Sequence, residues 1–160
     1  MITNTCLRSS KRSPPSVASG EATVIRVVVD LNIVVSALLG SSSCRAVVLA
    51  IERELVTPVA SVRLLNELRE VLGRPRFQAA ISVAAIHETL AILEDNALLV
   101  APRHRISVAR DPDDDHLLEI ALEASADAIV TGDKDLLVLD PFKGIPILAP
   151  RKFLAWLAAR

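Results

Sequence analysis

The stretch that decides the fold is Val24-Ile25-Arg26-Val27-Val28-Val29-Asp30, a nearly continuous run of β-branched residues that ends in a carboxylate. Such a run predicts a strand buried on both faces, because a strand with one solvated face alternates apolar and polar residues. Asp30 then stands at the carboxyl end of that strand. Ligands of open parallel sheets bind outside the carboxyl ends of the strands, so the position of Asp30 predicts part of a site.

Helical and extended patterns alternate along the rest of the chain. Ser61 and Asp111 are typical N-caps, Ser82 begins the longest predicted helix, and Pro112 suits the first position of a helix. We predict helices over residues 32–39, 42–51, 62–72, 82–97, 111–124 and 151–159, strands over 54–58, 128–131 and 145–148, and either a strand or a helix tail over 98–100. This alternation predicts a single α/β domain with a central parallel sheet of about four to five strands, flanked by helices.

Composition bounds the class of protein. The chain has 160 residues, which is the length of one domain, and 51% of them are hydrophobic. The most apolar region, 24–39, is interrupted by Arg26, Asp30 and Asn32, so no membrane span is expected. The apolar content therefore predicts a large core with surface to spare for a partner, including a second copy of the chain.

Charge is unevenly distributed. The net charge is −1, and residues 1–23 carry +2, so residues 24–160 carry −3. A body of this charge has no overall basic footprint of the kind many nucleic-acid binders have.

Residues 1–23 are rich in Ser, Thr and Pro without apolar periodicity, and we predict a disordered extension before a folded domain over 24–160. Cys6 and Cys44 form neither a disulfide framework nor a paired zinc motif, which favours a reducing cytoplasm.

Carboxylates are predicted to converge at one edge of the sheet. Asp133 follows the strand over 128–131 as Asp30 follows the first strand, and parallel strands end at the same edge. The acids of 111–115 begin a helix that leads into that later strand, and Glu67 lies in the second turn of another helix. Oxygen donors without Cys or an adjacent His favour Mg²⁺ or Mn²⁺. Carboxylate-held Mg²⁺ commonly serves displacement at phosphorus.

Each acid also has a purely structural interpretation. Asp30 could cap the next helix, Glu67 could pair with Arg63 one turn earlier, and Asp133 could stabilise a turn. The run 111–115 makes a good helix N-terminus without any further role. Helical position does not choose between Asp114 and Asp115 as the acid that enters a site. The three histidines are scattered and favour surface or packing roles.

Taken together, these residues resemble the PIN domain family. The matching segments are VVVDLNIVVSAL (27–38), LLNELREVL (64–72) with RPRF (74–77), RDPDDDHLL (110–118) and TGDKDL (131–136). The similarity spans about residues 24–156 and is greatest to bacterial toxins of toxin–antitoxin pairs related to VapC-like ribonucleases. One position departs from the pattern, since Leu31 stands where the family usually has Thr.

The resemblance implies a metal-dependent ribonuclease. It places the four acids of the family on Asp30, Glu67, Asp115 and Asp133, the third chosen by its spacing of 18 residues to the last. It implies that they bind Mg²⁺ or Mn²⁺, that Asn32 hydrogen-bonds within the site and that Thr131 supports Asp133. Arg110 and Lys134 are candidates for contacts to the RNA backbone. The implied partners are an RNA substrate, a small antitoxin protein and a second copy of the chain.

Two other functions compete with this one. A haloacid-dehalogenase-type phosphatase also places an Asp after its first strand, but it needs a second Asp where this chain has Asn32. A non-catalytic module that binds RNA or a protein partner is favoured by Leu31 and by the negative net charge. Turnover of a phosphomonoester and binding of Mn²⁺ separate these alternatives.

Overall fold

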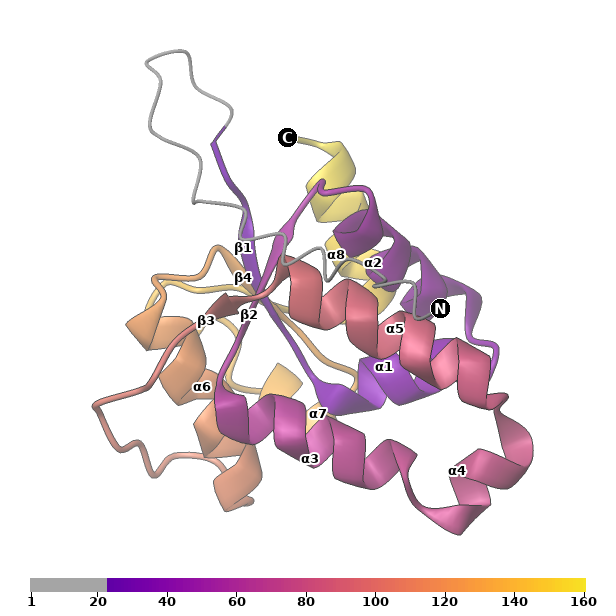
Figure 1. The fold of residues 1–160 in the computed structure, drawn as a ribbon. Helices are drawn as coiled ribbons and strands as arrows, with labels where there is room; N and C mark the ends of the chain where they lie inside the picture. The colour runs from indigo at the N-terminus through magenta and orange to yellow at the C-terminus, as the bar shows by residue number, and fades with distance from the viewer. Residues whose placement is uncertain (1–22) are drawn as a thin grey trace, which may run out of the picture.

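The computed structural model describes residues 23–160 and has a five-stranded parallel sheet at its centre, in the order β3-β2-β1-β4-β5 (Figure 1). The strands are β1 (Arg26–Val29), β2 (Thr57–Ala60), β3 (Leu98–Leu99), β4 (Ala128–Val130) and β5 (Ile147–Leu148). The helices are α1 (Leu31–Leu38), α2 (Ser42–Glu52), α3 (Val62–Leu72), α4 (Pro75–Ala80), α5 (Val83–Asn96), α6 (Pro112–Glu123), α7 (Lys134–Leu137) and α8 (Pro150–Ala158). The predicted α/β fold class is confirmed.

Strand β1 is buried on both faces, as its sequence predicts. Val27 and Val28 are fully buried, and Val29 is nearly so. Val27 and Val29 belong to the hydrophobic cluster on one side of the sheet, whereas Val28 belongs to the cluster on the other side. Successive side chains of a strand point to opposite faces, so this one β-branched run contributes to both cores.

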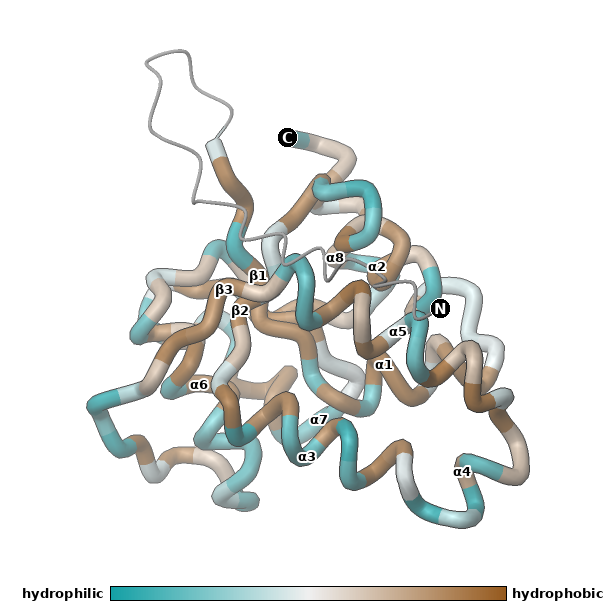
Figure 2. Tube along the Cα trace, in the orientation of Figure 1, coloured by the Kyte–Doolittle hydropathy of each residue, from teal (hydrophilic) through white to brown (hydrophobic). Residues whose placement is uncertain are grey.

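Helices cover both faces of the sheet. Helices α1, α2, α5 and α8 supply the first cluster, and α6 supplies the second (Figure 1). Helix α3 contributes to both, with Leu68 in the first cluster and Leu64 in the second, so it crosses the carboxyl edge of the sheet. In Figure 2 the central strands are mainly brown, whereas the loop between β3 and α6 is a mixture of teal, white and brown. The polar site must therefore lie at an edge of the sheet and not on its faces.

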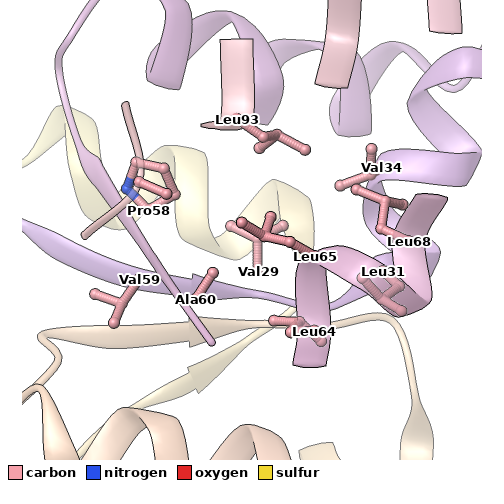
Figure 3. A pocket seen from close by; sticks show the side chains of 11 residues that line it. Val29, Leu31, Val34, Pro58, Val59, Ala60, Leu64, Leu65, Leu68 and Leu93 are labelled. Atoms are coloured by element: carbon pink, nitrogen blue, oxygen red, sulfur yellow. The ribbon is translucent and has the colours of Figure 1, made fainter. Parts of the chain in front are cut away.

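A small apolar cavity of about 30 Å³ lies behind α3 (Figure 3). Its lining comes from β1, β2, α1, α3 and α5, and includes Val29, Leu65, Leu68 and Leu93. Every residue that lines it is apolar, and a buried water needs two to four polar partners. This cavity is therefore dry and belongs to the core.

Strand β2 begins at Thr57, three residues later than predicted. Glu54 has a φ of +57°, and the backbone N–H of Leu55 donates to the carbonyl of Ala50 at 2.9 Å. These residues therefore form the C-terminal turn of α2 and are not yet extended. Pro58, which lacks an N–H, lies in β2 one residue before the stretch that pairs with β3. Its missing donor is tolerated because β3 is only two residues long.

Two short helices were not predicted. Helix α4 begins with Pro75 at its first turn, where proline is tolerated, although Gly73 and Pro75 correctly predicted the end of α3. Helix α7 is capped by Asp133, whose side chain accepts a hydrogen bond from the backbone N–H of Asp135. The predicted disordered extension lies, except for Thr23, outside the described residues. In the described range, no single helix is long and apolar enough to cross a membrane; α1 and α2 would meet that test only together, and they are bent by 108°.

Candidate functional site

An acidic cleft of about 200 Å³ opens at the carboxyl edge of the sheet. The chain runs from β1 outward to β2 and β3 and then returns to β4 beside β1, so the strand order reverses at this point. Ligands of open parallel sheets bind at such a reversal. No Lys, Arg or His is among the described residues that line the cleft. Its acidic lining residues are Asp30, Glu67, Asp111, Asp113, Asp114 and Asp133.

Asp30 is the most firmly held of these acids. It directly follows β1, is 7% exposed, and caps α1 by accepting a hydrogen bond from the backbone N–H of Asn32 on Oδ1 at 3.1 Å. Its Oδ2 accepts a hydrogen bond from the hydroxyl of Thr131 at 2.7 Å. The capping role considered from the sequence is therefore real, and it fixes the carboxylate at the cleft without excluding a functional role.

Thr131 connects the ends of the two central strands. Its side chain is fully buried, and its Oγ1 donates to Asp30 and accepts from the backbone N–H of Asp133 at 3.0 Å. Asp133 in turn accepts from the backbone N–H of Asp135 at 2.8 Å. The support of Asp133 by Thr131 is present as predicted, and the same hydroxyl also orients Asp30.

We expect Thr131→Val to lower the free energy of unfolding by about 1–3 kcal/mol, measured by chemical denaturation. The substitution keeps the shape of the side chain but leaves the N–H of Asp133 and Oδ2 of Asp30 without a partner, and the loss of a partner for a buried polar group has this cost. Thr131→Ser keeps the hydroxyl and serves as the control. Equal losses of stability in both variants would contradict the assigned role.

The structure places Asp114 in the lining of the cleft and leaves Asp115, the acid favoured by spacing, outside it. Asp115 is 6% exposed, and its Oδ1 accepts hydrogen bonds from the backbone N–H groups of Val108 and Ala109 at 3.0 and 2.8 Å. Its carboxylate therefore anchors the loop before α6. Consecutive residues of a helix differ in direction by about 100°, so the two aspartates face different surroundings.

Electrostatic repulsion is concentrated on the carboxylates of this cleft. Burial first, and then repulsion from Asp133 and three further aspartates, raises the pKa of Asp114 to about 6. The pKa of Glu67 is also raised, first by burial and second by Asp113, while Arg63 opposes the shift. Two carboxyl groups on different helices are thus penalised for being ionised together with their neighbours. A bound cation would relieve this penalty.

Glu67 does not form the ion pair with Arg63 that was its alternative, structural interpretation. Arg63 instead pairs with Asp113, with 2.8 Å between Nη2 and Oδ1, and both side chains are more than half exposed. This pair joins α3 to α6 at the cleft. Glu67 remains partly exposed and lines the cleft, so the structure leaves its carboxylate available.

The remaining predicted residues lie around the cleft. Asn32 lines it and contributes its backbone N–H to Asp30, and its side chain is exposed. Arg110 and Lys134 are exposed next to two of the lining aspartates, but neither lines the cleft itself. Leu31 lines the cleft and packs against both hydrophobic clusters, so it supplies an apolar contact where the PIN pattern has a hydroxyl.

The donor set fits a hard divalent cation. All charged donors are carboxylates, which Mg²⁺ and Mn²⁺ prefer, and repulsion from neighbouring aspartates contributes to the raised pKa of Asp114. In the described range, no three Asp, Glu, His or Cys side chains are gathered closely enough to hold an ion as they stand. Asp30, Glu67, Asp114 and Asp133 are the residues that would hold one.

The cleft therefore lies where open parallel α/β sheets bind their ligands, at the reversal of strand order. The PIN domain family model matches residues 26–135 of this chain. The chain therefore belongs to the PIN domain family, whose members are typically nucleases and generally use divalent metal ions.

Two individual proteins are similar to this chain in sequence or in fold. The uncharacterized protein MJ1680 of Methanocaldococcus jannaschii is 29% identical over 117 residues, which cover 72% of this chain and 75% of that protein. The crystal structure of PAE2754 from Pyrobaculum aerophilum matches the fold with a TM-score of 0.55. The match has 18% sequence identity and covers 85% of this chain and 91% of that chain.

Proposed function

We propose that this protein is a ribonuclease that depends on Mg²⁺ or Mn²⁺ and hydrolyses phosphodiester bonds of RNA. The observation that carries the proposal is the cleft at the centre of the carboxyl edge, where six acidic side chains gather without a basic residue in the lining. Membership of a family of typical nucleases supports hydrolysis of a nucleic acid. The resemblance to VapC-like proteins supports RNA as the substrate.

Each acid has a distinct part in this proposal. Asp30 is the central ligand, because its buried carboxylate is oriented by two donors. Asp114 and Asp133 complete the site, and Glu67 holds a second ion or orients the attacking water from the opposite helix. When bound, the metal ion lowers the pKa of water and neutralises charge on the phosphate.

Contacts to the RNA backbone are assigned to the rim of the cleft. Arg110 and Lys134 are exposed beside Asp111 and Asp133, so their cations can reach a phosphate whose neighbour lies in the cleft. Such contacts position a substrate without reading its sequence. The negative body of the protein makes these rim cations, together with the metal ion, the means of attracting RNA.

We further propose that the protein is the toxin of a type II toxin–antitoxin pair in the cytoplasm. Its resemblance to toxins of such pairs supports this role, together with an antitoxin partner and a homodimer. A short open reading frame beside the gene, whose product copurifies with the chain and suppresses RNA cleavage, is the expected observation. Copurification without suppression would contradict the toxin assignment and leave the nuclease assignment standing.

Cleavage of a mixed-sequence fluorogenic RNA tests the enzymatic activity. We expect cleavage in Mn²⁺ or Mg²⁺, a fall of at least about a hundredfold in EDTA, and recovery on addition of excess Mn²⁺, because the carboxylates alone provide no electrophile. Cleavage that EDTA leaves unchanged would overturn the proposal. Turnover of a phosphomonoester without RNA cleavage would instead favour a phosphatase.

A further inference from the structure

We infer that a buried chain of hydrogen bonds, Ser61–His116–Glu119, sets the position of Glu67 relative to Asp114, and that His116 is a positioning residue for the acidic cleft. This inference rests on the proposed function, because it concerns the residues that would hold the metal ion. It starts from three buried polar side chains that the proposed reaction does not otherwise use.

The three side chains form a continuous and fully paired chain. Oγ of Ser61 lies 2.8 Å from Nε2 of His116, and Nδ1 of His116 lies 3.4 Å from Oε2 of Glu119. All three residues are less than 9% exposed. With its proton on Nδ1, the imidazole donates to Glu119 and accepts from the hydroxyl of Ser61, so each group finds a complementary partner.

The two ends of the chain are tied to backbone elements that carry the cleft. Ser61 is the N-cap of α3 and accepts the backbone N–H of Leu64 at 3.0 Å, and Glu67 follows on the same helix. Glu119 accepts the backbone N–H of Ile106 at 2.9 Å, in the segment that precedes α6. His116 itself lies on α6, two residues after Asp114. The chain therefore joins α3 to α6 and to the preceding segment.

The hydrogen-bonded chain fixes the position of α3 along α6, which apolar packing alone does not fix. Leu64 of α3 and Leu117 of α6 share one hydrophobic cluster, but apolar contact is non-directional and permits small shifts of one helix along another. Hydrogen bonds are directional, and their strength falls steeply away from linear geometry. Glu67 and Asp114 both line the cleft, one from each helix, so a directional link between α3 and α6 fixes where the two carboxylates lie relative to each other.

The same residues do not constitute a hydrolytic triad. Ser61 is 4% exposed, its oxygen already accepts the capping hydrogen bond, and it lines neither the acidic cleft nor the apolar cavity. His116 is absent from both linings as well. His116 therefore acts on the site through Ser61 and α3, without touching substrate.

A matched pair of substitutions at His116 tests the inference in the full-length protein. The amide of His116→Gln can occupy the place of Nε2 and keep the link to Ser61, whereas the shorter amide of His116→Asn can occupy the place of Nδ1 and keep only the link to Glu119. Mn²⁺ affinity, measured by calorimetry without RNA, should fall about tenfold in His116→Asn, the range known for groups that orient metal ligands. In His116→Gln it should stay within about twofold of the wild type.

A double-mutant cycle with Glu67→Gln supplies the second readout. In the Glu67→Gln background, His116→Asn should no longer alter Mn²⁺ affinity, because the ligand it positions is gone. Thermal unfolding of all variants is recorded in parallel. Equal losses of affinity in the Asn and Gln variants, or an undiminished effect in the Glu67→Gln background, would overturn the inference. If the Mn²⁺ affinities follow the predicted cycle but the wild-type protein cleaves no RNA, the proposed ribonuclease activity is contradicted and the inference about His116 is supported.

Discussion

Asp30→Asn is expected to reduce RNA cleavage by at least about a hundredfold and to abolish measurable Mn²⁺ binding at the cleft. The substitution removes the charge of the central carboxylate, and loss of one group that stabilises developing charge has an effect of this size. The amide oxygen of Asn can still accept from the backbone N–H of Asn32, which is the bond that caps α1. The fold should therefore persist while the activity is lost.

Single-turnover cleavage and Mn²⁺ titration measure the two effects. Asp95→Asn is the matched control, because Asp95 is an exposed acid of α5 outside the cleft, and its variant should cleave RNA at the wild-type rate. Retention of more than a third of the wild-type rate by Asp30→Asn would remove the catalytic assignment of the cleft.

Substitutions of the neighbouring residues Asp114 and Asp115 are expected to have very different effects on RNA cleavage. Asp114→Asn should lower cleavage about a hundredfold or more, because Asp114 lines the cleft among the other acids. Asp115→Asn should change cleavage less than about threefold. Both hydrogen bonds of Asp115 end on Oδ1, so the carbonyl oxygen of an Asn can accept the same two backbone N–H groups.

Asp115→Ala separates anchoring of the loop from chemistry. It leaves the N–H groups of Val108 and Ala109 without their acceptor, so the free energy of unfolding should fall by about 1–3 kcal/mol. Residual activity of the folded fraction should remain measurable. If Asp115→Asn loses activity and Asp114→Asn retains it, the assignment of the third acid returns to Asp115.

The pH dependence of stability gives an independent measure of crowding at Asp114. Its pKa is about 6 in the folded protein and 3.8 in the unfolded chain, so the folded state binds the proton more tightly between these values. Wild-type stability therefore falls as pH rises from about 4 to 6, relative to Asp114→Asn. In EDTA at pH 7.5 the variant should be more stable by about 1 kcal/mol after allowance for solvent screening.

Urea unfolding of both proteins at pH 4 and pH 7.5 tests this sign. The difference should be close to zero at the lower pH, where Asp114 is protonated in the wild type, and should favour the variant at the higher pH. Saturating Mn²⁺ should reverse the order at pH 7.5, because only the wild type keeps the full set of ligands. A variant that is less stable than the wild type in EDTA would show that Asp114 is not electrostatically crowded.

The local sequence was sufficient to predict those features of the structure that depend on residues close together in the chain. The β-branched run before Asp30 predicted a strand buried on both faces, and Val27 and Val28 are fully buried. Ser61 and Asp111 were predicted as N-caps, and each accepts a backbone hydrogen bond in that role. Capping and alternation of side chains involve residues a few positions apart, so they can be recognised without knowledge of the fold.

Other features depend on contacts beyond the local pattern, and these were not predicted from the sequence. Strand β2 begins at Thr57 because the chain first completes the turn after α2, with a hydrogen bond from Leu55 to Ala50. Helix α4 was not predicted because Pro75 was interpreted only as a signal that α3 ends, whereas it is the first residue of α4. A surface or packing role was predicted for His116 as for the other histidines. Its partner Ser61 is 55 positions away and was predicted only as a cap, so their hydrogen bond was not foreseen.

The sequence by itself determined the alternation of strands with the longer helices, the resemblance to the PIN family, and the kind of site: oxygen donors at the ends of parallel strands, suited to a hard cation. Tertiary structure alone decided which acids meet. Spacing along the chain favoured Asp115, but a spacing does not measure the direction of a side chain, which turns by about 100° with each helical residue. Backbone N–H groups of Val108 and Ala109 hold Asp115 away, and Asp114 is left to face Asp30 and Asp133. That choice depends on a loop folded against the helix, and so on contacts that a local pattern does not contain.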